Sequence, residues 1–269
     1  MSLKAMLVLR LFWVIEVPGA FSCKKPRRRL PEARAIPSHV KALQAVKLCE
    51  QYKPRAGADN QGCAVMKLNL GCGSQVPEGW VNVDYALGAR FAKNPLFRLI
   101  NKPLGLFDMQ WNDKIFLHDL TKPFPWANAS VEAVYTSHTL EHLSREEGRH
   151  FLSECHRVLK PNGIIRVIVP DLKHVVDEYI QGRTKADNVL EELGVLFGVG
   201  SSPLKKRLAP FVQFPHKCMY DTPRLLEILD ETGFVASSKG AFDSGIPDIR
   251  SIEFESRTEH AVVVEGRKR

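Results

Sequence analysis

The residues best suited to chemistry lie between Met66 and Asp84. An apolar stretch runs directly into Gly71, Cys72 and Gly73, and a second short apolar stretch ends at Asp84. Two glycines permit a tight turn with unusual backbone angles and let a ligand approach the backbone closely. A carboxylate can accept hydrogen bonds from both hydroxyls of a ribose. The pattern predicts a nucleotide-like ligand at the carboxyl edge of a parallel sheet, where open α/β folds bind such ligands.

The spacing of these residues differs from that of a dinucleotide-binding fingerprint. That fingerprint needs a third glycine at a helix start and an acid about 20 residues later, whereas here the third glycine is Gly79 and Asp84 follows soon after. The segment 74–80 contains Pro77 and is too short for a helical crossover, which takes at least about 10 residues. A pyrophosphate would therefore lack its helix N-terminus. A ligand without phosphates fits better, and a nicotinamide-dependent oxidoreductase remains the alternative.

The rest of the chain alternates apolar strands with amphipathic helices, which predicts a parallel α/β sheet. Ser144 and Glu147 form a capping box before an apolar helix face, and Gly233 follows another helix as a C-cap. A turn at 160–163 is expected to separate the first of these helices from the next strand. Strands are expected at residues 67–70, 81–83, 115–117, 131–136, 164–169, 235–239 and 261–265.

Charge is unevenly distributed along the 269 residues. Residues 1–65 carry twelve Lys and Arg against four Asp and Glu, whereas residues 66–269 carry 26 of each. The predicted folded domain, 66–269, is therefore neutral, and nucleic acid is not expected as its partner. Residues 1–36 are expected to be a basic, disordered leader with possible peripheral membrane contact, and residues 37–65 a helix and a linker.

The six cysteines are scattered and form no C-x-x-C pair and no zinc-type cluster. They are expected to be reduced, in a cytoplasmic protein without a metal site. Cys72 lies inside the glycine turn. We expect it to be packing filler rather than a nucleophile, because no activating histidine lies near it in the sequence.

Several segments, taken together, resemble the class I S-adenosylmethionine-dependent methyltransferases, within them the small group that begins near a K-L-N-L-G-C-G segment. The resemblance spans about residues 66–265. It is carried by the glycine turn 70–73, Asp84, the Asp119-Leu120 pair, and the segments 124–126, 137–143, 157–163 and 233–234.

The resemblance implies a Rossmann-like, doubly wound sheet of seven mostly parallel strands whose last strand is antiparallel. It implies S-adenosyl-L-methionine as cofactor and assigns its contacts by position. The residues that would line the cofactor are Leu70, Gly71, Cys72, Gly73, Asp84, Asp119, Leu120 and Ser137. The sequence departs from the family pattern in lacking the first crossover helix and in having Glu132 where many relatives have aspartate.

A hydroxyl acceptor must lose a proton during methyl transfer, so a residue that can act as a base is expected near the methyl group. The candidate catalytic residues are His138, His142 and Asp171, although Asp171 could instead cap the following helix. His216 and Tyr220 are the candidate acceptor-binding residues. The acceptor is expected to be a small molecule or a saccharide, and a non-catalytic cofactor-binding module is a further alternative.

Overall fold

A computed structural model describes residues 65–92, 112–196 and 214–269. The chain divides into two compact units, Met1–Pro37 and Ser38–Arg269, and all described residues belong to the second. The predicted leader, the predicted helix in 37–65 and its linker lie outside the described residues, apart from Val65. Among the described helices, none is long and apolar enough to cross a membrane.

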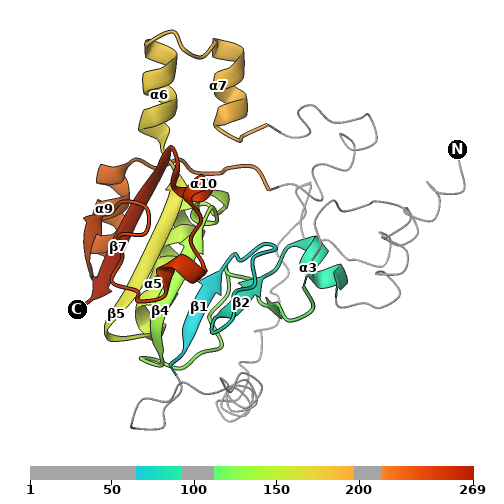
Figure 1. Ribbon diagram of the computed structural model, residues 1–269, viewed down its shortest axis with the longest axis vertical. Helices are drawn as coiled ribbons and strands as arrows, with labels where there is room; N and C mark the ends of the chain where they lie inside the picture. The colour runs from blue at the N-terminus through green and yellow to red at the C-terminus, as the bar shows by residue number, and fades with distance from the viewer. Residues whose placement is uncertain (1–64, 93–111, 197–213) are drawn as a thin grey trace, which may run out of the picture. The chain divides into compact units, whose positions relative to one another are not determined.

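Seven strands form one sheet in the order β3-β2-β1-β4-β5-β7-β6 (Figure 1). The strands are β1 (Lys67–Leu70), β2 (Val81–Asp84), β3 (Phe116–Leu117), β4 (Val131–Ser137), β5 (Leu159–Pro170), β6 (Phe234–Ser238) and β7 (Ala261–Lys268). The pairs from β3 to β5 are parallel, and β7 is antiparallel to both of its neighbours. The predicted mostly parallel sheet with an antiparallel last strand is confirmed.

Helices connect these strands where the sequence has clear start signals. The elements are α3 (Leu87–Ala92), η1 (Leu140–His142), α5 (Arg145–Val158), α6 (Leu172–Ile180), α7 (Ala186–Glu192), α9 (Thr222–Glu231), η2 (Ile249–Ser251) and α10 (Glu255–Thr258). The capping box is present at α5, where Ser144 and Glu147 bond reciprocally. Gly233 follows α9 at a φ of 99°, as expected of a C-cap. The short helices α7 and α10 were not expected from the sequence.

The connection from β1 to β2 contains no helix, as expected. Residues 71–80 pass through turns only, yet the two strands are parallel, with Leu68 opposite Val81. The turn after β1 therefore does not open a helix. This geometry suits a ligand that needs no helix dipole at that point.

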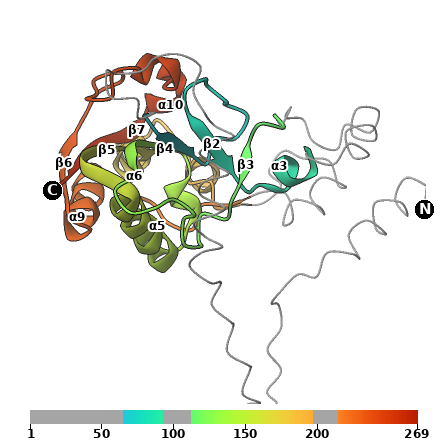
Figure 2. The same cartoon turned by 90° about the horizontal axis from the view of Figure 1, so that it is seen from below.

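Two apolar layers cover the sheet. One cluster joins β1, β2, β4, β5 and β7 to α5 and α9 through buried residues such as Leu70, Val134, Phe151 and Leu229. The other lies between the opposite face and the segment before α10, and includes Ile246 and Ile249. Figure 2 shows α5 and α9 on one side of the sheet and α10 on the other.

A buried ion pair fixes the second layer to β5. Arg166 and Glu253 are both fully buried, and Arg166 donates from Nε to Glu253 Oε2 (2.5 Å) and from Nη2 to Glu253 Oε1 (2.9 Å). The guanidinium also donates to the carbonyl oxygens of Gly240 and Asp243. All these groups are hydrogen-bonded, which a buried charge requires.

The predicted turn at 160–163 lies within the bounds of β5, but its four residues have no partner on β4. The pairing passes from Val131 and Leu159 directly to Ala133 and Ile164. Asn162 adopts a φ of 62°, a conformation that asparagine tolerates better than most residues. The chain therefore passes from α5 directly into an irregular β5.

Candidate functional site

The glycine turn lies at the carboxyl end of β1, against the turn that follows β4. Gly71 has a φ of 75°, and a Cβ there would come within 2.0 Å of Thr139 Oγ1. Gly73 has a φ of 56°, but a Cβ there would meet nothing within 4 Å. The two positions thus require glycine for different reasons. Gly71 is packed against Thr139, whereas Gly73 has an open side on which a ligand could lie.

Asp84 is bonded to this turn. Its Oδ2 accepts from the Gly73 amide at 2.8 Å and its Oδ1 accepts from the Ala86 amide at 2.7 Å. The Val83 carbonyl accepts from the amides of Gly71 and Cys72. A carboxylate offers about four acceptor positions, so Asp84 retains two for a ligand. The structure brings the two predicted elements, turn and acid, together.

The Cys72 thiol points into the protein. Its side chain is buried in a small cluster with Ala89 and Ile115. Burial, with a contribution from the nearby Asp84 charge, raises the pKa of the thiol well above its ordinary range. The thiolate is the reactive form, so the position suits packing rather than nucleophilic chemistry.

The remaining predicted cofactor residues differ in what their side chains can offer. Leu70 and Leu120 are buried in the core, which leaves their backbone for a ligand. Asp119 Oδ1 accepts from the amide and the hydroxyl of Thr121. Ser137 Oγ, at the end of β4, is buried and makes no hydrogen bond to any described residue. Such an unpartnered hydroxyl is typical of a place that a ligand completes.

A buried carboxylate lies in the turn after β4. Glu141 is fully buried, and neither of its side-chain oxygens has a hydrogen-bond partner among the described residues. His138 Nδ1 lies 3.5 Å and His216 Nε2 lies 4.0 Å from Glu141 Oε1. Glu141 was not predicted as a site residue. Its position in the segment 137–143 was the available signal.

The three histidines around Glu141 are each held by a backbone carbonyl. His138, which has a φ of 52°, contacts the Arg257 carbonyl through Nε2 at 3.0 Å. His142 contacts the Pro215 carbonyl through Nδ1 at 3.4 Å, and His216 contacts the Leu193 carbonyl through Nδ1 at 2.7 Å.

The structure thus brings together three of the predicted residues, from two distant segments of the chain. The rings of His142 and His216 pack edge to face at 4.9 Å. Burial lowers the pKa of His216, against an opposing effect of the Glu141 charge.

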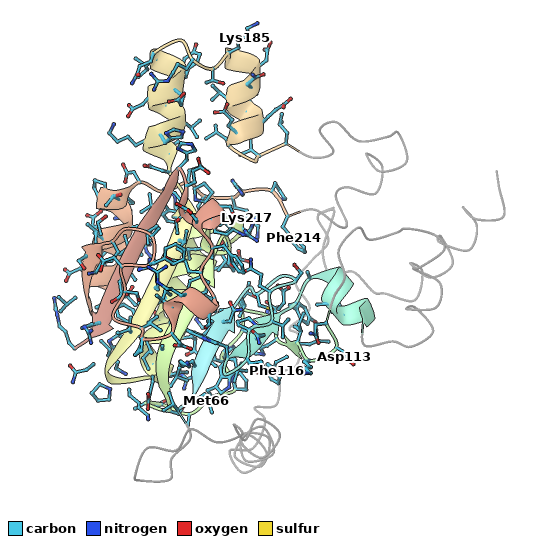
Figure 3. All side chains as sticks on the ribbon, in the orientation of Figure 1. Met66, Asp113, Phe116, Lys185, Phe214 and Lys217 are labelled. Atoms are coloured by element: carbon cyan, nitrogen blue, oxygen red, sulfur yellow. The ribbon has the colours of Figure 1, made fainter. Side chains whose placement is uncertain are left out.

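The segment that carries Lys217 lies toward the carboxyl edge, at the opposite end of the sheet from Met66 (Figure 3).

Asp171 and Tyr220 lie outside the cluster of histidines around Glu141. Asp171 Oδ1 accepts from the Lys173 amide at 2.8 Å and caps α6. Tyr220 is buried, and its hydroxyl lies beside Gly148 of α5. Burial raises the pKa of this hydroxyl, with the neighbouring Cys218 as the next cause.

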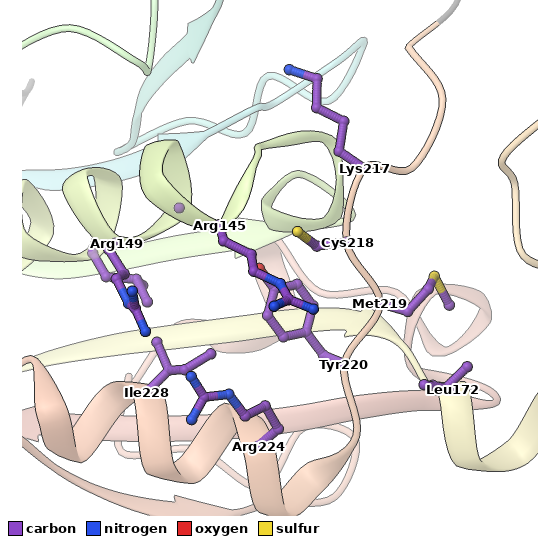
Figure 4. Close-up of a pocket in the computed structure, with 11 residues that line it drawn as sticks. Arg145, Arg149, Leu172, Lys217, Cys218, Met219, Tyr220, Arg224 and Ile228 are labelled. Carbon is purple, nitrogen blue, oxygen red and sulfur yellow. The ribbon is translucent and has the colours of Figure 1, made fainter.

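Tyr220 forms part of the wall of a pocket between α5 and α9. The pocket has a volume of about 620 Å³. Figure 4 shows three arginines, Arg145, Arg149 and Arg224, around it, with the Lys217 side chain pointing away. The glycine turn and Asp84 do not line this pocket, so Tyr220 and Asp84 face different spaces.

Residues 99–167 match the family model described as "Methyltransferase domain". This match supports a class I S-adenosylmethionine-dependent methyltransferase. The matched region of this methyltransferase includes β4, α5 and most of β5. The predicted enzyme class and cofactor are confirmed.

The methyltransferase also resembles solved structures, at low sequence identity. One is an S-adenosylmethionine-dependent methyltransferase from Methanosarcina mazei, with 15% identity, a TM-score of 0.43, and coverage of 82% of this chain and 96% of that one. Another, from Archaeoglobus fulgidus, has 17% identity, a TM-score of 0.40, and coverage of 86% and 93%. The 1,6-didemethyltoxoflavin-N1-methyltransferase of Burkholderia thailandensis has 13% identity, a TM-score of 0.40, and coverage of 89% and 93%. A search of curated proteins gave no match.

Proposed function

We propose that the enzyme transfers the methyl group of S-adenosylmethionine to a small molecule or a saccharide, with the cofactor bound against the open side of the glycine turn and beside Asp84. The observation that carries the proposal is the junction of β1 and β2. There Asp84 bonds the Gly73 amide at 2.8 Å, while the other side of Gly73 is open.

The residues at this edge fit the cofactor. Asp84 retains acceptor positions for ribose hydroxyls, the glycine backbone allows close approach, and Ser137 Oγ is an unpartnered polar atom nearby in the fold. S-adenosylmethionine supplies an electrophilic methyl group on a sulfonium centre. The protein orients the cofactor and the acceptor, and orientation can supply roughly 7 to 11 kcal/mol in favourable cases.

The charge distribution supports a small acceptor. Residues 66–269 carry equal numbers of acidic and basic residues, whereas proteins that bind nucleic acid present a basic surface. His138, His142 and Asp171 stay predictions as bases, and His216 and Tyr220 stay predictions as acceptor contacts. Asp171 is already engaged as a helix cap, which favours the two histidines.

Equilibrium binding tests the cofactor site. Calorimetry with the full chain should show binding of S-adenosylhomocysteine and no binding of NAD. Tight binding of NAD, with none of S-adenosylhomocysteine, would instead support a nicotinamide-dependent oxidoreductase.

Methyl transfer into a cell extract tests turnover and acceptor class together. With radiolabelled S-adenosylmethionine, we expect label in the small-molecule or glycan fraction, and not in nucleic acid. The Asp84→Ala variant serves as the control that lacks the cofactor contact. Absence of label in every fraction, despite bound cofactor, would indicate a non-catalytic module.

A further inference from the structure

The cluster around Glu141 carries an inference beyond methyl transfer. Glu141 and His142 belong to η1, and His216 lies in the segment before α9. One ligand-type atom from each residue lies within 4.8 Å of the others. Two imidazoles and one carboxylate are a donor set that binds zinc and other divalent transition metals.

The state of the carboxylate points to a cation. Glu141 is fully buried, and neither oxygen accepts a hydrogen bond from a described residue. A buried carboxylate without partners is costly, because its charge has left water. Buried polar atoms of this kind call for an explanation, and a bound ion is one of the ordinary ones.

The tautomers of the two histidines also favour a bound cation. A carbonyl oxygen can only accept, so the ring nitrogen that faces it carries the proton. His216 thus donates from Nδ1 to the Leu193 carbonyl, and His142 from Nδ1 to the Pro215 carbonyl. In the neutral rings the Nε2 atoms keep their lone pairs. Metal-binding histidines are held in this way, with the second nitrogen donating to a backbone carbonyl.

One lone pair directly faces the carboxylate. His216 Nε2 lies 4.0 Å and His138 Nδ1 lies 3.5 Å from Glu141 Oε1. A ring lone pair and a carboxylate oxygen face each other favourably only with a proton or a metal ion between them. A tetrahedral zinc site places its ligand atoms roughly 3.4 Å apart, since each metal–ligand bond is about 2.1 Å. The observed spacing of up to 4.8 Å is wider than this value, so the three side chains would have to move together to bind the ion.

We propose that Glu141, His142 and His216 bind a divalent transition metal ion, with zinc as the natural probe. The ion would join η1 to the segment before α9. Three protein ligands leave a fourth coordination position for water or another donor. The expectation from sequence that the protein has no metal site is thereby revised for this cluster.

Zinc binding to the metal-stripped, tag-free full chain tests the site, with no cofactor or acceptor present. We expect about one zinc per chain and a loss of affinity of at least about tenfold in Glu141→Gln and in His216→Ala. His174→Ala is the matched control, because the His174 and His260 rings stack at 4.0 Å elsewhere and form another histidine pair. Its affinity should equal that of the wild type.

Two outcomes would overturn the proposal: no zinc binding by the wild type, or unchanged affinity in both Glu141→Gln and His216→Ala. Because a variant could fail to fold, the wild type is also loaded with Co²⁺. Nitrogen and oxygen ligands should give visible bands without a thiolate charge-transfer band. A thiolate band would place the metal on cysteines and reject the site. Either failure leaves the proposed methyl transfer untouched, since neither measurement involves it.

Discussion

Two buried glutamates in the described part of the chain have opposite surroundings. Glu253 accepts hydrogen bonds from Arg166 and from the Phe242 amide, so both of its carboxylate oxygens have a partner. Glu141 is equally buried, but its carboxylate has no hydrogen-bond partner among the described residues. The first arrangement attaches the segment before α10 to β5. The second lies in the turn after β4, among three histidines.

The difference separates a structural charge from one that awaits a ligand. A buried ion pair with complete hydrogen bonding holds two elements in one arrangement, and breaking it is costly. An unpartnered carboxylate contributes no such bonds to the fold, so its burial is explained by what it can bind. Substitutions at the two glutamates should therefore change the free energy of unfolding in different directions.

The largest effect is expected at the ion pair. Glu253→Ala should lower the free energy of unfolding by about 3–5 kcal/mol, because Arg166 loses its bidentate partner and keeps only Glu265, whose Oε2 lies 3.6 Å from Arg166 Nη1. Urea denaturation of the full chain measures this. The double variant Arg166→Met/Glu253→Leu should recover most of the loss. If the single variant is as stable as the wild type, the pair does not hold the segment.

The glycine turn gives the next effect. Gly71→Ala should cost about 3 kcal/mol, from overpacking against Thr139 together with backbone strain. Gly73→Ala is the matched control, because its φ is also positive but its Cβ would meet nothing. It should cost about 1 kcal/mol. Equal losses of stability in urea would show that Thr139 does not restrict Gly71.

Asp84→Ala should weaken binding of S-adenosylhomocysteine by about 1–3 kcal/mol, because polar groups of the ligand lose a buried partner. Calorimetry gives the difference. Asp187→Ala, which removes an exposed carboxylate of α7, should leave the affinity unchanged. An equal affinity in Asp84→Ala would remove Asp84 from the cofactor site.

Asp171→Ala should lower stability by about 1 kcal/mol through loss of the α6 cap. Asp171→Ser should restore that stability, since serine also caps. Measuring methyl transfer in Asp171→Ser then separates the two roles. A normal rate supports capping alone, whereas a large loss of rate in a stable variant would identify the carboxylate as a base.

The smallest effect is expected at Glu141. In the zinc-free protein, Glu141→Gln should raise the free energy of unfolding or leave it within about 0.5 kcal/mol, because an unpartnered buried charge is removed. Urea denaturation in the presence of a chelator tests this. A loss comparable to that of Glu253→Ala would mean that Glu141 is already paired, with His138 Nδ1 at 3.5 Å as the nearest ring nitrogen. The two glutamates would then play the same structural role.

The sequence predicted the elements with local signals. The capping box at Ser144, the C-cap at Gly233 and the apolar strands all depend on residues close together in the chain. The joining of the glycine turn to Asp84 was predicted because strand order fixes it. The segment 160–163 keeps its irregular course inside the bounds of β5, because none of its residues pairs with β4.

The unpredicted features depend on contacts between distant segments. Nothing near Arg166 in the sequence indicates Glu253 as its partner, and nothing near Glu141 indicates His216. The conformation of Gly71 was expected, but its steric reason, Thr139, lies on another strand's turn. The short helices α7 and α10 have weak local signals of their own. The cytoplasmic location stays a prediction.

The contact between Gly71 and Thr139 has a thermodynamic consequence. The two turns fit together with no room for a methyl group between them, and Thr139 is two residues from Glu141. A ligand that moved one turn would therefore have to move the other, and this would couple the affinities at the two places. Such linkage is reciprocal: whatever an ion after β4 does to the affinity for the cofactor, the cofactor does equally to the affinity for the ion.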